Sequence, residues 1–132
     1  MLSRTDLTSI ARARLRDAKV LLSNGRSDGA AYLCGYAVEI ALKARIVKTL
    51  KWSGFPEKSG EFDGYRSFKT HDLDILLHLS GWEAKIKTTL LAEWSAIKEW
   101  NPDSRYERPG LMTHPKASAM VDSVKAILGA LL

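Results

Sequence analysis

The chain of 132 residues is long enough for one domain with a continuous hydrophobic core and too short for two. Its composition, with 45% hydrophobic and 27% charged residues and only 4 prolines, excludes a disordered or collagen-like chain. A formal net charge of +5 is compatible with a polyanionic partner, but many proteins without such a partner carry a similar charge.

The sequence also indicates a compartment. No stretch approaches the roughly 20 apolar residues that cross a bilayer, and charges near the N-terminus interrupt the apolar run that a secretory signal peptide needs. The lone cysteine, Cys34, cannot form an internal disulfide and lies among apolar residues, which indicates a buried thiol in a reducing compartment. We therefore expect a cytoplasmic protein with no membrane segment.

The first predicted element is a helix over about residues 5 to 23. Its apolar side chains recur at steps of three and four, as on one face of a helix. Four basic residues fall largely outside this stripe, namely Arg12, Arg14, Arg16 and Lys19. Asn24 and Gly25 both tolerate positive φ, so we expect them to end the helix.

A second helix is predicted from Ser27 or Asp28, either of which is a plausible N-cap, to about residue 51. Its middle is apolar on two adjoining faces, and one of these faces consists mostly of small residues. We therefore expect this helix to lie at the centre of the domain, where a neighbouring helix approaches it closely. Glu39 and Lys43 have the spacing and order of a favourable i,i+4 ion pair.

Residues 53 to 69 interrupt the helical pattern with three glycines and a proline. A loop of this length inside a compact domain is usually functional or mobile. Four aromatic side chains indicate that at least part of it folds back on the helices, and these are Phe55, Phe62, Tyr65 and Phe68.

Three more helices are predicted after this loop. A short one begins near Thr70, and residues 80 to 83 have the pattern of a capping box for a longer one whose apolar stripe runs from Trp82 to Ile97. The last covers about residues 116 to 131. The sequence thus predicts an all-α, up-and-down bundle of about five helices over residues 1 to 132, with two long antiparallel helices and no strand.

Most kinds of catalytic site find no support in this sequence. His71 and His78 lie about 10.5 Å apart along a helix, too far to hold one ion, and no cysteine pair or carboxylate cluster has metal-ligand spacing. The chain also lacks a phosphate-binding loop and a nucleophile elbow. We expect neither a metal nor a cofactor.

One irregular segment, from Arg105 to His114, concentrates two guanidiniums, a phenol and an imidazole. On a regular helix, Arg108 and His114 would point about 120° apart, so their convergence needs the non-helical connection that Pro109 and Gly110 provide. There the imidazole could deprotonate a ribose hydroxyl while the guanidinium holds the phosphate. The alternative is a polar loop whose arginines cap helix ends and pair with Glu39 or Glu107.

Several short motifs appear along the chain in a recognisable order. They are Tyr32, the run Gly35-Tyr36-Ala37-Val38-Glu39-Ile40-Ala41-Leu42-Lys43-Ala44, His71-Asp72-Leu73 with Leu76, Trp100-Asn101 and Arg105-Tyr106. Together they resemble the HEPN domain, especially the small stand-alone HEPN proteins of prokaryotes. The likeness spans nearly the whole chain, and the run in the second helix is its most specific part.

The resemblance implies a helical bundle that often forms homodimers, and it implies two functional branches. Some HEPN proteins are metal-independent ribonucleases, often toxins, that use an Arg-x4–6-His motif in a cleft between two subunits. Others lack that motif and accompany a small nucleotidyltransferase, with a role in binding nucleotide or substrate. Here Arg108 and His114 have the spacing of the motif, but Pro109 stands where the nuclease pattern usually has a polar residue.

Three hypotheses follow from the residues and the resemblance. The first is a dimeric accessory protein that binds nucleotides or RNA, with Glu39, Lys43, Arg105 and Tyr106 as candidate ligand-binding residues. The second is a ribonuclease in which Arg108 and His114 are catalytic. The third is a structural subunit that packs against a partner, in which the four matched polar residues form an ion-pair network between the second helix and the Arg-Tyr loop.

Overall fold

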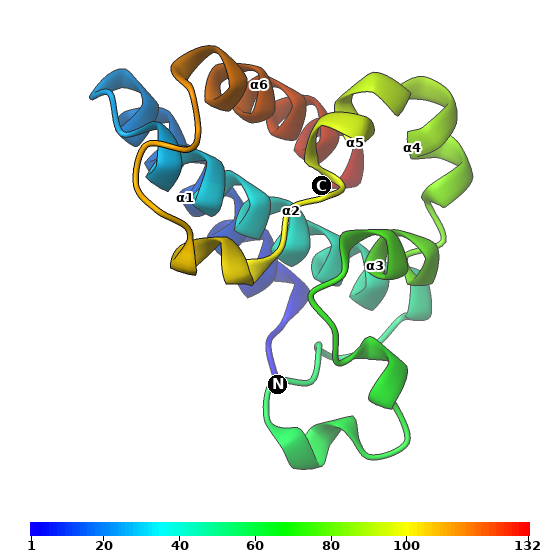
Figure 1. Ribbon diagram of the computed structural model, residues 1–132. Helices are drawn as coiled ribbons and strands as arrows, with labels where there is room; N and C mark the ends of the chain where they lie inside the picture. Colours follow the sequence, from blue (N-terminus) through cyan, green and yellow to red (C-terminus); the bar gives the residue numbers. More distant parts are fainter.

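A computed structural model describes all 132 residues and contains six α-helices, three short 3-10 helices and no β-strand (Figure 1). The α-helices are α1 (Arg4–Ser23), α2 (Ser27–Leu50), α3 (Leu73–Leu79), α4 (Glu83–Thr89), α5 (Leu91–Ile97) and α6 (His114–Leu131). The 3-10 helices are η1 (Ser59–Phe62), η2 (Arg66–Phe68) and η3 (Pro102–Tyr106). The predicted all-α bundle is confirmed, with six helices where about five were expected.

Helices α1 and α2 form a hairpin, and the start of each helix is stabilised differently. The Ser3 hydroxyl accepts a hydrogen bond from the Asp6 N–H at 3.1 Å and caps α1, and Gly25 turns the chain with a φ of 73°. The expectation that Ser27 or Asp28 caps α2 was wrong. Arg26 is the residue that precedes this helix, and its side chain makes no cap hydrogen bond. The Asp28 carboxylate does not cap the helix either, since it accepts backbone N–H groups of a distant segment.

Helix α2 is the central element, as its apolar composition predicted. It packs against α1, α3, α6 and η3 (Figure 1), and half of its residues are buried. Gly35 is one of them, and a Cβ at this position would overlap the indole of Trp100. The missing side chain therefore lets the segment after α5 lie directly on α2.

The stripe from Trp82 to Ile97, predicted as one helix, is broken at Leu90, whose φ is −134°. Two threonines precede the break, and the Thr89 hydroxyl donates to the Lys85 carbonyl, a hydrogen bond that competes with the helical ladder and bends helices. The predicted capping box was also wrong. The Ser80 hydroxyl accepts from the Trp82 N–H and donates to the Leu77 carbonyl, so it stabilises the turn after α3 rather than the start of α4.

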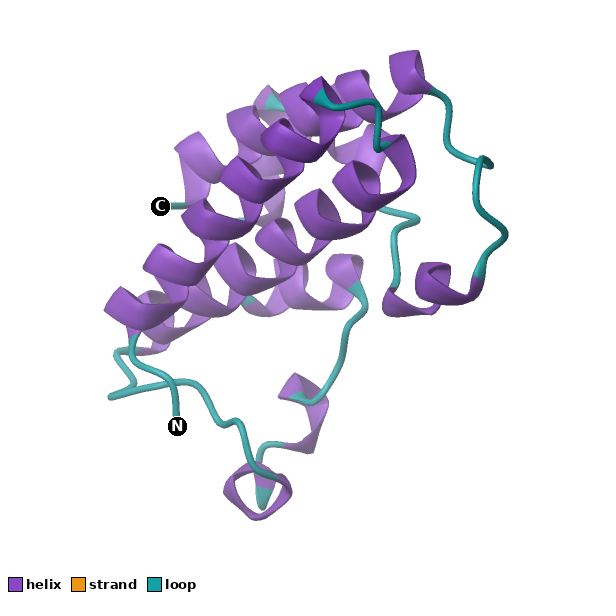
Figure 2. Ribbon diagram, turned by 90° about the vertical axis from the view of Figure 1, so that its left-hand side faces the viewer, coloured by secondary structure: helices purple, strands orange, loops and turns teal.

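The segment between α2 and α3 lies at one end of the bundle, beside the N-terminus (Figure 2), and part of it packs on the core there, as its aromatic residues predicted. Backbone hydrogen bonds of 2.9 and 2.7 Å pair Leu2 with Phe55. Phe55 and Phe62 are buried, and Trp52 packs its ring against Tyr65 and Phe68. This aromatic cluster covers one end of the α1–α2 hairpin.

One hydrophobic core joins residues from all six helices. Cys34 lies in it fully buried, and burial raises the pKa of its thiol to about 12. The predicted core face of α6 is confirmed, because Met120, Val124, Ile127 and Leu131 are all buried. None of the helices combines the length and the apolar character that crossing a membrane requires.

Candidate functional site

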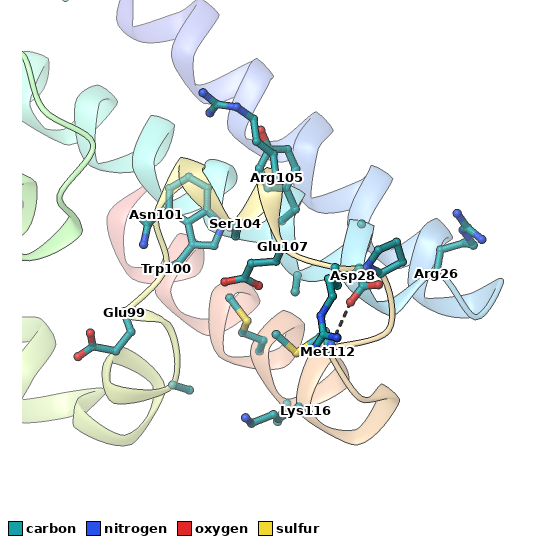
Figure 3. Close-up of a pocket in the computed structure, with 18 of the residues that line it drawn as sticks. Arg26, Asp28, Glu99, Trp100, Asn101, Ser104, Arg105, Glu107, Met112 and Lys116 are labelled. Atoms are coloured by element: carbon teal, nitrogen blue, oxygen red, sulfur yellow. Dashed lines mark hydrogen bonds between the residues drawn. The ribbon is translucent and has the colours of Figure 1, made fainter.

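A cavity of about 890 Å³ opens between the start of α2, the end of α5, η3, the segment before α6, and α6 itself (Figure 3). The start of α2 meets there with four consecutive stretches from the last third of the chain, between residues 95 and 120. The lining residues are Arg26, Asp28, Gly29, Ala31, Tyr32, Ser95, Ala96, Glu99, Trp100, Asn101, Ser104, Arg105, Glu107, Arg108, Pro109, Met112, Lys116, Ala119 and Met120.

The inner surface of the cavity is largely apolar and aromatic. Trp100, which is 8% exposed, supplies an indole (Figure 3), and Met112 and Met120 also line the cavity. Tyr36 packs edge-on against Trp100 with ring centroids 4.8 Å apart, and Tyr32 packs against Tyr36 at 5.2 Å. Because aromatic side chains have few rotamers and these three brace one another, this wall is rigid.

Charged side chains surround the apolar and aromatic residues of this inner surface. The cations are Arg26, Arg105, Arg108 and Lys116, and the anions are Asp28, Glu99 and Glu107. The guanidiniums of Arg26 and Arg105 extend away from the centre, whereas the Glu107 carboxylate points toward the space beside Trp100 (Figure 3). Glu107 has no ion-pair partner in the chain. It is a free hydrogen-bond acceptor at the cavity.

Arg105, a predicted ligand-binding residue, lies at the rim in a fixed position. One guanidinium nitrogen donates to the Pro102 carbonyl at 3.1 Å, and the group stacks on Tyr106 with 4.6 Å to the ring centroid. Hydrogen bonding to Tyr106 and Tyr32 raises the pKa of Arg105, so it stays charged. Tyr106 is 76% exposed and lies beside the rim without lining the cavity.

Asp28 fixes the wall formed by residues 107–113. Its carboxylate accepts the Gly110 N–H at 2.6 Å and the Met112 N–H at 2.9 Å (the latter is drawn in Figure 3). These two backbone hydrogen bonds lower the pKa of Asp28. Gly110 has a φ of 89°, a left-handed conformation that side chains disfavour and that turns its N–H toward the carboxylate.

Glu39 and Lys43, the other predicted ligand-binding residues, lie outside the cavity. Glu39 is 3% exposed and forms an ion pair with Lys43 at 3.5 Å and a direct hydrogen bond with His71 Nδ1. The predicted ion pair between Glu39 and Arg105 was wrong, because His71 and Lys43 take up the carboxylate. The charges of Glu39 and Arg105 both act on Tyr36 instead. Burial raises the pKa of Tyr36 to about 12, the charge of Glu39 also raises this pKa, and the charge of Arg105 lowers it.

A family model for the HEPN domain matches residues 5–58 of this chain. The resemblance to the HEPN family is thereby confirmed over these residues, and beyond residue 58 it stays a prediction. The match covers α1, α2 and the start of the segment after α2, so it includes the motif run in α2. No curated protein and no solved structure matches the chain.

The predicted catalytic pair lies on either side of the turn that Asp28 anchors. Arg108 lines the cavity, whereas His114 begins α6 and does not line it, and both residues are exposed. The connection between them is irregular, as Pro109 and Gly110 predicted. The role of Arg108 and His114 as a catalytic pair stays a prediction.

Sequence reasoning missed the residues that shape the cavity. Asp28 was interpreted as a cap, and Trp100 was quoted only as part of the family pattern. A signal for Trp100 was present, because a glycine within a continuous helical run, such as Gly35, indicates a bulky neighbour at close range. No comparable signal pointed to Asp28. No group of three or more His, Cys, Asp or Glu side chains lies close enough to hold a metal ion.

Proposed function

We propose that this HEPN chain is a nucleotide- or RNA-binding accessory protein that works as a homodimer and takes its ligand into the cavity beside Trp100. The observation that carries the proposal is the combination of the aromatic rings of Trp100 and Tyr32 with two unpaired cations, Arg108 and Lys116, in the lining of one cavity. At about 890 Å³ the cavity lies within the usual range for small-molecule sites, which are mostly apolar with a few polar groups.

The base of the ligand would lie in the inner part of the cavity. The face of a nucleobase packs on aromatic and thioether groups, which Trp100 and Met112 supply. The free Glu107 carboxylate would accept hydrogen bonds from ring N–H or amino groups of the base. This pairing would give the carboxylate the partner that the chain itself does not provide.

The phosphate would lie at the rim, near Arg108 and Lys116. Neither side chain forms an ion pair within the chain, so both charges are free for a ligand. A guanidinium holds phosphate through two parallel hydrogen bonds, and an ammonium adds a point charge. Binding that depends on these contacts weakens as the salt concentration rises.

The homodimer and a small nucleotidyltransferase partner belong to the same proposal and rest on the family resemblance. Sedimentation of the purified chain tests the dimer directly. A complex with a nucleotidyltransferase would be tested by co-purification of the two chains, with the nucleotidyltransferase alone as control.

The central test is calorimetric titration at low ionic strength with adenosine and guanosine monophosphates and with a short single-stranded RNA. We expect Arg108→Gln to lower the affinity about tenfold, since one charge-assisted phosphate contact is lost. Arg66→Gln removes the same charge from an exposed residue remote from the cavity and should have little effect. Undetectable binding of all three ligands would refute the proposal.

The same RNA separates binding from the ribonuclease hypothesis. Cleavage that survives a chelator and disappears in His114→Ala would establish the nuclease with Arg108 and His114 as its catalytic residues. Equal cleavage by the variant and the unaltered chain would remove that hypothesis. If the chain neither binds nor cleaves but does form a complex with a partner, the structural subunit is the remaining function.

A further inference from the structure

The segment 107–113 forms one wall of the cavity. Its Met112 side chain packs against the hydrophobic core, and between its two ends its backbone is hydrogen-bonded to the rest of the fold at a single place. Apart from the bonds that complete η3 and start α6, its only hydrogen bonds are those of Gly110 and Met112 to Asp28. Both hydrogen bonds are accepted by one exposed carboxylate, that of Asp28 at the start of α2. The tether therefore depends on a single side chain.

The two ends of this segment are fixed. At one end the Glu107 N–H completes η3 by donating to the Ser104 carbonyl at 3.1 Å. At the other end Thr113 caps α6, since its carbonyl accepts from Ala117 at 2.9 Å. An exposed segment with fixed ends and few internal contacts can open locally while the rest of the fold stays intact.

We propose that residues 107–113 are a lid on the cavity, and that Asp28 is the positioning residue that holds this lid closed and keeps Arg108 at the rim. The effect on ligand exchange rests on the proposed nucleotide-binding function. The lid itself does not, because its hydrogen bonds form within the free chain.

The chemistry of the tether requires a carboxylate. Asp28 accepts two N–H groups at once because each carboxylate oxygen faces one donor. In Asp28→Asn one oxygen becomes an NH₂ group, which is itself a donor and cannot accept the second N–H. The lowered pKa of Asp28 keeps the carboxylate ionised throughout the neutral range, so the lid is held whenever the chain is folded near neutral pH.

Amide hydrogen exchange of the free protein tests the lid. We expect Asp28→Asn to speed the exchange of the Gly110 and Met112 amides at least tenfold, since one charge-assisted hydrogen bond is lost. The amides in the middle of α2 should be unchanged. Asp122→Asn makes the same substitution at an exposed position of α6 without a partner and is the matched control. Equal exchange of the two amides in Asp28→Asn and in the unaltered chain would overturn the proposal.

Stopped-flow kinetics with a fluorescent adenosine monophosphate analogue tests the role in ligand exchange. With the lid released, we expect a dissociation rate about tenfold faster and a faster association rate. A purely structural role of Asp28 would leave the association rate unchanged. Faster amide exchange with unchanged kinetics would overturn the gating role. If the unaltered chain binds no nucleotide, the proposed function fails, and amide exchange still decides whether the lid exists.

Discussion

The α1–α2 hairpin and the cavity wall from Trp100 to Thr113 are stabilised in different ways. The hairpin follows from local sequence features: apolar side chains recur every three or four residues, Ser3 caps the start of α1, and Gly25 lies in the turn between the two helices. The segment from Trp100 to Thr113 contains one short 3-10 helix. Its second half is fixed by Asp28, whose hydrogen-bond partners Gly110 and Met112 lie 82 and 84 residues further along the chain. The family pattern therefore identifies the scaffold, whereas long-range contacts shape the cavity.

The two regions meet at Gly35 and Trp100, and the largest effect is expected there. In Gly35→Ala the new Cβ would overlap the indole ring, so Trp100 must leave its place on α2. Overpacking of this kind costs about 3 kcal/mol of unfolding free energy, measured by urea denaturation. Unchanged stability would show that the wall does not depend on close contact with the hairpin.

Glu39→Ala should have the second largest effect, a loss of about 2 kcal/mol measured in the same way. The substitution removes a buried carboxylate and leaves Lys43 and His71 without their partner. His71→Ala should cost less, because its side chain is 61% exposed and Lys43 still pairs with Glu39. An equal loss in the two variants would mean that His71, and not the buried charge, carries the stability.

A pH-dependent effect is expected in the alkaline range and arises from two side chains of α2. The pKa of Cys34 is raised from 9.0 to about 12, so the unfolded chain releases this proton first. The stabilisation is fully present below pH 9 and is lost as the pH rises toward about 12. Tyr36, with its pKa raised from 10.0 to about 12, acts in the same direction. Denaturation curves of Cys34→Ala should show a weaker loss over this range than those of the unaltered chain.

The smallest expected effect is a gain in stability from Gly129→Ala, and this variant is also the control for Gly35→Ala. Gly129 lies in α6, and a methyl group at this position would have nothing within 4 Å, so alanine fits there without a clash. Gly129→Ala should raise the unfolding free energy by about 0.5 kcal/mol, because the unfolded chain loses freedom. A loss at this position would indicate that α6 tolerates alanine poorly for another reason, such as a contact between subunits.

The sequence predicted those parts of the fold that depend on neighbours in the chain. The bounds of α1, the central place of α2 and the buried face of α6 all follow from periodicity. The break at Leu90 escaped prediction because the apolar stripe continues through it, and the threonine that bends the helix lies outside the stripe. The cavity was predicted only through Arg105 and Arg108, since the role of Asp28 depends on a tertiary contact that no spacing encodes.

The position of Trp100 gives this protein an optical reporter of its own. Of its four tryptophans, Trp52, Trp82 and Trp94 do not line the cavity, so Trp100 alone would change its emission when a base stacks there. Intrinsic fluorescence can therefore follow occupancy of the cavity in the unlabelled chain. Replacing the other three indoles with phenylalanine would isolate that signal.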